Sequence, residues 1–329
     1  MSPETRSRAR LVEGDVGAHL RRLGVPMGIG FLAILMFQVV DTFFVGQLGT
    51  QPLAAIGFTF PIGFLVMSIA LGLGVANASV LSQCIGAGEG RRAARIATDA
   101  VGLAVLIVVP VSILGILTID WVFGAMGATG PVLDMVRDYM QVWYAGVGLL
   151  FVPIAANSAI RATGDTRTPA IVMGISGVLN MVLDPLLIFG LAGFPRLEVR
   201  GAALATVLSW SVSTVVALLL LWRRERLVNL RPDGFREVLR SWRALLFVAG
   251  PATGTSVVMP VSGAVLTAIM ARFGDAAVGA YGVGVRIEPM ATIGIMAMAS
   301  ALPVFVGQNW GAGEVGRVLE AIARSARFA

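Results

Sequence analysis

The segment Gln38-Val-Val-Asp41-Thr-Phe-Phe-Val-Gly-Gln47 places an acid in the middle of an apolar stretch. Asp41 is the only formal charge between residues 23 and 46, a run long enough for a helix to cross a bilayer. Placing a carboxylate at membrane depth costs about 2.5–3.5 kcal/mol on insertion scales. Such a residue usually faces a protein-lined or water-filled interior, so Asp41 marks a candidate functional site.

The composition of the whole chain is that of a polytopic membrane protein. Of its 329 residues, 57% are apolar and 13% are charged, and the mean hydropathy is +0.84, whereas a soluble domain carries about 25% charge. Every basic residue is an arginine, and the arginines cluster between apolar runs. The net charge of +6 therefore indicates a membrane face, and no nucleic-acid partner is expected. With one histidine and one cysteine, the chain offers neither a His-based metal or catalytic site nor an internal disulfide.

Eight apolar runs predict an all-α bundle of membrane-spanning helices at 23–46, 53–84, 97–119, 136–160, 168–191, 201–222, 244–271 and 276–309. A short interfacial helix is expected within 8–22, and no cleaved signal peptide is expected before it. The spacing of Phe235, Val238, Leu239 and Trp242 predicts a surface helix in the charged segment before the seventh span. The expected organisation is a cytoplasmic N-terminal segment at 1–22, a first lobe at 23–222, a cytoplasmic linker at 223–243 and a partial second lobe at 244–329.

The arginines predict the orientation. The N-terminus and the turns after even-numbered spans hold 20 of the 25 arginines, and the turns after odd-numbered spans hold four. Positive residues accumulate on the cytoplasmic side, so the N-terminus is expected in the cytoplasm and the chain in the inner (plasma) membrane. The expected partners are the lipid bilayer and a small-molecule substrate, with the protein as a monomer.

The two halves of the chain carry an internal repeat with an offset of 225 residues. The matches are Pro26 with Pro251, Gly49 with Gly274, Gln83 with Gln308, and Gly86-Ala-Gly-Glu89 with Gly311-Ala-Gly-Glu314. Six spans separate the copies, so both enter the membrane in the same direction, as in a parallel repeat. The second copy holds two complete spans, so the natural protein is expected to continue for about 110–130 residues.

Polar side chains at membrane depth share helix faces in the first copy. Gln38 and Asp41 are three residues apart, and Asn180 and Asp184 are four apart. Thr206 lies in the sixth span, and Asn157 lies near the cytoplasmic end of the fourth. Carboxylate, amide and hydroxyl oxygens suit Na⁺, or a proton with an organic cation in its place. The alternative is that Asp41 and Asp184 only join helices by hydrogen bonds.

Three further residues carry open alternatives. Pro26 and Pro185 interrupt the helical hydrogen-bond ladder, which permits bending during function or simply leaves a static kink. Glu288, in the eighth span, is either a second-half counterpart of the acids or a structural residue. The position 225 residues after Asp41 is Leu266, so the second copy does not duplicate this acid.

The motifs together resemble those of the multidrug and toxic compound extrusion (MATE) family of cation-coupled exporters. The likeness is carried by Val40-Asp41-Thr-Phe-Phe-Val-Gly-Gln-Leu-Gly49, Gly86-Ala-Gly-Glu89, Ala162-Thr-Gly-Asp165, Asn180-Met-Val-Leu-Asp184-Pro185, Gly201-Ala-Ala-Leu-Ala-Thr206, Arg286-Ile-Glu288 and Gly307-Gln308-Asn-Trp-Gly-Ala-Gly313.

The resemblance implies twelve helices in two six-helix lobes that form a V, from which this chain departs by stopping after its eighth span. It implies that Asp41, Asn180, Asp184 and Thr206 form a first-lobe site for H⁺ or Na⁺. Gln38 and Asn157 would line the same cavity, and Pro26 would let the first span bend. Glu288 is similar to a second-lobe acid implicated in coupling in part of the family. No cofactor beyond the coupling ion is implied.

The expected function is therefore an antiporter that exports cationic amphiphilic compounds in exchange for H⁺ or Na⁺, and not an enzyme. The first alternative, a flippase or exporter of lipid-linked sugars, needs a basic cavity for pyrophosphate, whereas the membrane-depth charges here are mainly acidic. The second, an intramembrane hydrolase, needs two catalytic acids in a protease-like setting, which Asn180-Met-Val-Leu-Asp184-Pro185 does not provide.

Overall fold

A computed structural model describes residues 11–225, 227–229, 234–273, 288 and 291–328. Within these residues all regular structure is helical. The long helices are α2 (Val16–Gly46), α3 (Thr50–Gly86), α4 (Gly90–Ala125), α5 (Gly130–Gly146), α6 (Gly148–Ala162), α7 (Arg167–Phe189), α8 (Glu198–Leu219), α9 (Phe235–Ala271), α11 (Ile293–Gly311) and α12 (Val315–Phe328). Two short helices, η1 (Leu191–Gly193) and η2 (Leu220–Arg224), flank α8. Seven helices are long and apolar enough to span a membrane, and the bent pair α5–α6 makes an eighth candidate, which confirms the all-α polytopic prediction.

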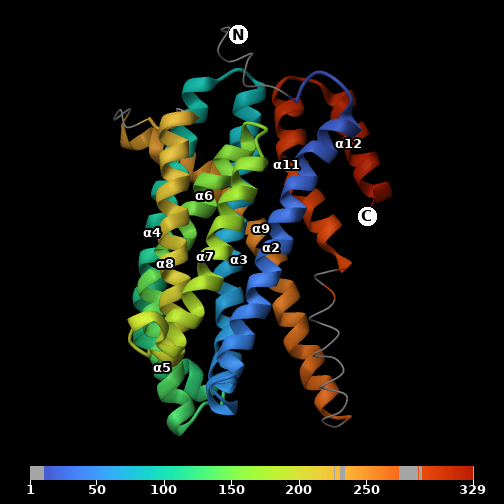
Figure 1. The fold of residues 1–329 in the computed structure, drawn as a ribbon. Helices are drawn as coiled ribbons and strands as arrows, with labels where there is room; N and C mark the ends of the chain where they lie inside the picture. The colour runs from blue at the N-terminus through green and yellow to red at the C-terminus, as the bar shows by residue number, and fades with distance from the viewer. Residues whose placement is uncertain (1–10, 226, 230–233, 274–287, 289–290, 329) are drawn as a thin grey trace.

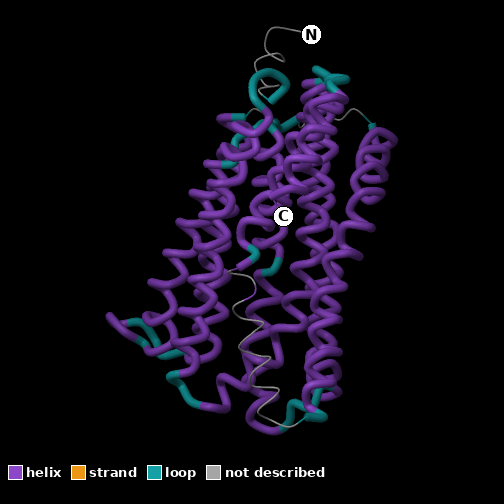
Figure 2. Tube along the Cα trace, turned by 90° about the vertical axis from the view of Figure 1, so that its right-hand side faces the viewer, coloured by secondary structure: helices purple, strands orange, loops and turns teal. Residues whose placement is uncertain are grey.

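The helices stand side by side along one common direction (Figures 1 and 2). Helices α2 and α9 both begin at the end of the bundle that carries the N-terminus and run away from it, and their far ends diverge (Figure 1). The common direction of α2 and α9 is the one expected for the first helices of two parallel repeats.

Several helices begin earlier than the apolar runs indicate, among them α4 at Gly90 and α5 at Gly130. Helix α2 begins at Val16 and not at 23, because the Asp15 carboxylate accepts the Ala18 N–H at 2.6 Å and caps the helix. Residues 16–22, expected to belong to a separate interfacial helix, are therefore the first turns of α2. The surface helix predicted around Trp242 is likewise continuous with the seventh span as α9. The predicted start of the eighth span lies outside the described residues.

The fourth span is broken into α5 and α6, which meet at an angle of 42°. Pro153 cannot donate to the carbonyl of Leu149, one turn earlier, and two glycines flank the break. The Thr214 hydroxyl donates to that carbonyl oxygen at 2.9 Å, and the Ser112 hydroxyl donates to the Tyr144 carbonyl oxygen at 2.6 Å. Since free backbone groups are costly in a bilayer, these hydroxyls let the span bend.

The two repeats meet through reciprocal close contacts at the arginine-rich end of α3 and α11. A Cβ atom added at Gly86 would overlap the backbone carbonyl of Gln308, and one added at Gly311 would overlap the backbone carbonyl of Gln83. Gly86 and Gly311 are repeat equivalents, as are Gln83 and Gln308. The two pairs of repeat equivalents therefore form one contact between the repeats. Only glycine at positions 86 and 311 permits the backbones to approach so closely.

The same pseudo-symmetry governs the flanking helices. A Cβ atom at Gly72 of α3 would overlap the side chain of Thr253 on α9. In the mirrored contact, a Cβ atom at Gly28 of α2 would lie 3.5 Å from the Cβ atom of Ala297 on α11. Residues 28 and 253 are repeat equivalents, as are 72 and 297. These paired contacts are consistent with a two-fold relation between the repeats.

The segment before α2 is bound to the second repeat at the same end. The Gln308 side chain accepts the Leu11 N–H at 3.3 Å and donates to the Ala162 carbonyl oxygen at 2.7 Å. Arg317 donates to the carbonyl oxygens of Gly14 and Leu11 at 2.7 and 3.1 Å. Gln308 therefore links α11 both to the N-terminal segment and to the end of α6.

Replacing Asp165 with asparagine is expected to lower stability at neutral pH by about 1 kcal/mol, because the amide can still cap the helix but loses the charge that strengthens the hydrogen bonds and the ion pair with Arg224. Burial raises the pKa of Asp165, but bonds from the Thr168 hydroxyl (2.6 Å) and N–H (3.1 Å) and the ion pair with Arg224 (2.9 Å) outweigh it, so the pKa is lowered overall. A lowered pKa gives stability that is present above the unfolded pKa of 3.8 and lost as pH falls through the folded value. Thermal unfolding in detergent between pH 3 and 7 tests this, with exposed Asp134→Asn as the control; equal loss in both variants would contradict it.

Candidate functional site

The candidate site lies where α2, α7 and α8 converge. Val45, Ile56, Ile188, Val199 and Ala202 form a small buried apolar cluster, with Tyr139 packed against it. Asp41, Asp184 and Thr206 each stand one helical turn from a member of this cluster. Because α2 and α7 run away from the arginine-rich end and α8 runs back toward it (Figure 1), the cluster lies on the far side of the site.

Asp184 and Asn180 form the buried centre of the site. The Asp184 and Asn180 side chains are 0% and 1% exposed, and Thr206 is 9% exposed. In the orientation that satisfies both its neighbours, the Asn180 amide nitrogen donates to Asp184 Oδ2 at 3.1 Å and its oxygen accepts the Thr206 N–H at 3.3 Å. The Thr206 hydroxyl donates to the Ala202 carbonyl oxygen at 3.1 Å. The structure thus brings together the predicted polar residues of α7 and α8.

Asp41 completes the group from α2. It is partly buried and lies close enough to Asp184 for their charges to repel each other. Within the described residues, the Oδ1 atoms of Asp41 and Asp184 are both buried without a hydrogen-bond donor. An ionised carboxylate is only an acceptor, so these oxygens fit a proton or a bound cation.

The donor set consists of two carboxylates and the neutral oxygens of Asn180 and Thr206. No group of three or more His, Cys, Asp or Glu residues gathers anywhere in the described part of the chain. The pair of acids, with the neutral oxygens of Asn180 and Thr206, supplies the hard oxygen ligands that Na⁺ prefers. The same atoms can take up a proton, because two carboxylates in a shared site do not easily both stay charged.

The other predicted residues lie apart from this hydrogen-bonded group. Gln38 is exposed one turn before Asp41, and its carbonyl oxygen accepts the Thr42 hydroxyl at 2.8 Å. Asn157 is buried in α6, and its Oδ1 atom has no partner within the described residues. Glu288 is exposed, and its described contacts are with Thr292 through its carbonyl oxygen. Pro26 and Pro185 lie inside α2 and α7, which continue as single helices through them.

Tyr139 belongs to the site although the sequence did not single it out. It comes from α5 and packs against the buried apolar cluster that adjoins the acids. A tyrosine in a membrane span also fits an interfacial belt, so spacing alone does not identify it.

Comparisons with known proteins place this arrangement in a family. The family model described as MatE matches residues 26–186 and 251–329. A Shewanella oneidensis protein named "FAD transporter" is 38% identical over 323 residues, which are 98% of this chain and 72% of that protein. The Bacillus subtilis "Probable multidrug resistance protein YoeA" is 27% identical, over 91% of this chain and 65% of its own length. A crystal structure of a Vibrio cholerae MATE transporter, VcmN, is 30% identical with a TM-score of 0.89, over 98% of this chain and 70% of that one.

The two-lobe helical bundle with a polar site inside its first lobe defines the class as a polytopic membrane transporter. The chain belongs to the MatE family. It spans about two-thirds of the length of these relatives. The relatives are transporters and not enzymes, and the fold match confirms the family resemblance found in the sequence motifs.

Proposed function

We propose that this protein is a secondary active exporter in which Asp41 and Asp184 load the coupling cation, H⁺ or Na⁺. The observation that carries the proposal is the pair of buried carboxylate oxygens without donors, set beside the Asn180 and Thr206 oxygens. Two like charges held close together are stabilised when one cation binds between them. Gln38, Asn157 and Glu288 line the route of substrate or ion in this proposal, and Pro26 and Pro185 allow their helices to bend.

The transport cycle follows from competition for one acid pair. A coupling cation that enters from outside binds Asp41 and Asp184 and displaces the substrate, and the lobes then rock about their contact at the arginine-rich end. A ligand shifts such an equilibrium only by its difference in affinity for the two states. The cation gradient thus drives the exchange. In this proposal the protein is a monomer in the inner membrane, and its N-terminus lies in the cytoplasm.

The first candidate substrate class is cationic amphiphilic compounds. An acid pair attracts organic cations as it attracts Na⁺, and the Bacillus relative bears the name of a probable multidrug resistance protein. An apolar lobe interior with few acids suits substrates that combine a positive charge with apolar surface.

The second candidate is FAD or a similar dinucleotide. It is favoured by the Shewanella relative, which is named an FAD transporter and is more similar in sequence, at 38% identity, than the Bacillus multidrug relative at 27%. FAD carries a pyrophosphate, so its export would need basic groups along its path in addition to the acid pair. The lipid-linked sugar flippase needs the same groups and has no relative among these to favour it.

Reconstituted vesicles distinguish these candidates. Vesicles that contain the full-length protein are loaded with ethidium or with FAD, and a pH gradient or a Na⁺ gradient is then imposed. We expect either the pH gradient or the Na⁺ gradient to drive export of ethidium or of FAD, at a rate well above that of vesicles without the protein. Export that is independent of both gradients would overturn cation coupling, and gradient-driven export of FAD alone would assign the second substrate class.

A further inference from the structure

The first turns of α9 carry a groove outside the candidate site. Leu239, Trp242, Arg243, Leu246 and Phe247 line it, with a volume of about 530 Å³. The groove is open to the surroundings, and Phe247 is 82% exposed. Because α9 descends from the arginine-rich end of the bundle (Figure 1), the groove lies where a helix enters the membrane.

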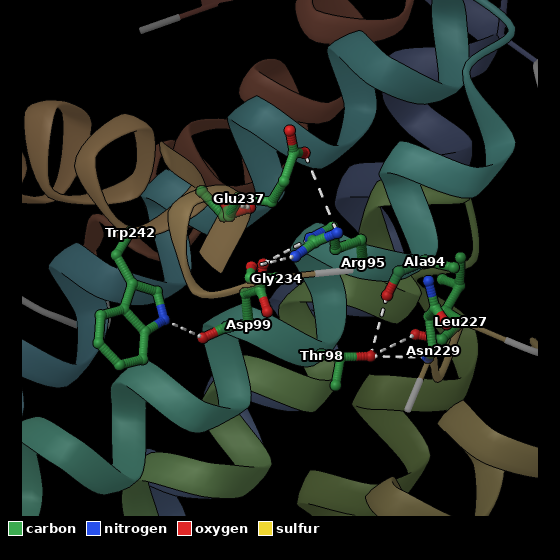
Figure 3. Close-up of polar contacts among 10 residues, drawn as sticks. Ala94, Arg95, Thr98, Asp99, Leu227, Asn229, Gly234, Glu237 and Trp242 are labelled. Carbon is green, nitrogen blue, oxygen red and sulfur yellow. Dashed lines mark hydrogen bonds and ion pairs between the residues drawn. The ribbon is translucent and has the colours of Figure 1, made fainter. Parts of the chain in front are cut away.

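One wall of the groove is fixed by polar contacts to the first lobe. The Trp242 indole N–H donates to the Asp99 carbonyl oxygen at 3.0 Å (Figure 3). Arg95 lies 3.5 Å from the Asp99 carboxylate and 4.0 Å from that of Glu237. The linker is held nearby, where the Asn229 N–H donates to the Thr98 hydroxyl at 2.9 Å. The indole is therefore held in place, with its apolar body available to the groove.

The charge beside the groove has no acidic partner among the residues that the structure describes. Arg236, Arg240 and Arg243 are exposed, and none of the three forms an ion pair within the described part of the chain, in contrast to Arg95. Their spacing of four and three residues places them on one stripe of α9. Along the same helix, Leu246 and Phe247 follow Arg243 by about 4.5 and 6 Å in the direction away from the arginine-rich end.

The internal repeat supplies a comparison for the exposure of this face. The repeat equivalents of Arg243, Leu246 and Phe247 are Ala18, Arg21 and Arg22 on α2. These are also exposed, although all six spans of that lobe are present. The equivalent face of the complete lobe is thus not covered by its own helices.

We propose that this groove binds one anionic diacyl phospholipid from the membrane leaflet at the arginine-rich end. The order of groups along α9, cations first and then aromatic and aliphatic side chains, matches the order of phosphate and acyl chain along a lipid. Arg240 and Arg243 bind the phosphate, and an acyl chain packs on Leu246, Phe247 and the Trp242 ring. Arginines near an anionic membrane surface and tryptophans at its interface are favourable for this chemistry.

Native mass spectrometry of the detergent-purified chain tests the proposal with added dioleoylphosphatidylglycerol or dioleoylphosphatidylcholine. We expect one phosphatidylglycerol molecule to be retained in preference to phosphatidylcholine. Arg243→Gln should weaken its binding about fivefold, and Arg240→Gln with Arg243→Gln about 25-fold, since each arginine contributes about 1 kcal/mol. The matched control is Arg91→Gln, which removes an exposed arginine, without an ion pair among the described residues, from the same end of the bundle. Phe247→Ala should weaken retention of both lipids.

Equal binding of the two lipids, or equal losses in Arg243→Gln and Arg91→Gln, would overturn the proposal. Dimers that disappear in Phe247→Ala would assign the groove to a second copy of the chain instead. Lipid binding is measured without transport, so its result is independent of whether the proposed exchange reaction is correct.

Discussion

Asp41→Asn and Asp184→Asn are each expected to reduce gradient-driven export to the level of empty vesicles, while the protein still folds. Asparagine keeps the size of the side chain but can bind neither a proton nor a cation with a negative charge. Each substitution also removes the repulsion between the two acids. We therefore expect the unfolding temperature of each variant to equal or exceed that of the wild type, and we expect transport to fail for a chemical reason.

The combination of transport and thermal unfolding separates this mechanism from a purely structural role. If the acids only join helices by hydrogen bonds, both variants should lose stability by about 1–3 kcal/mol, the penalty of an unsatisfied buried group. Asp134→Asn, at an exposed position of α5, supplies the control for an Asp-to-Asn change. Normal gradient-driven export by both Asp41→Asn and Asp184→Asn would show that the coupling site lies elsewhere.

Gly86→Ala and Gly311→Ala are expected to push the two repeats apart at the arginine-rich end. Each new Cβ atom would overlap a backbone carbonyl, which cannot rotate away as a side chain could. Overpacking of this kind costs about 1–3 kcal/mol, which shifts a two-state equilibrium about 5- to 150-fold toward separation. Ser82 is buried in this contact, so the alkylation rate of Ser82→Cys, in a Cys84→Ser background, measures how far the contact opens. We expect faster alkylation of that cysteine from the arginine-rich side in both glycine variants.

Gly57→Ala is the matched control for these variants. Gly57 lies on α3 as Gly86 does, but a Cβ atom there meets no atom within 4 Å. It should leave the alkylation rate unchanged. If the rates in Gly86→Ala and Gly311→Ala stay at the Gly57→Ala value in folded protein, the glycine contact does not hold this end closed.

The helical bundle could be predicted because an apolar run of membrane length can form few structures other than a membrane-spanning helix. The run that carries Asp41 ends at Gly46 in both sequence and structure, since a glycine-containing turn stops it. The start of α2 and the break between α5 and α6 were missed for different reasons. Asp15 extends α2 by a local cap that hydropathy does not register, while Gly146, Gly148 and Pro153 were a visible signal of the break.

The candidate site could be predicted only in part. Spacing within one helix placed Asn180 and Asp184 on one face, and that face is the one that meets Thr206. Spacing gives no distance between helices, so the packing of Tyr139 of α5 against the cluster beside the acids needed the three-dimensional structure. The same limit applies to Glu288, because its described contacts are local and do not join it to the acids.

The reciprocal approach of Gly86 to Gln308 and of Gly311 to Gln83 means that one sequence motif supplies both sides of a contact. A surface that pairs with its own equivalent is isologous, the kind from which two-fold homodimers are built. A single ancestral lobe with this motif would already have carried a self-complementary face. Fusion of two such lobes would then preserve an existing interface, and differences between the halves, such as Asp41 against Leu266, could accumulate without loss of the pairing.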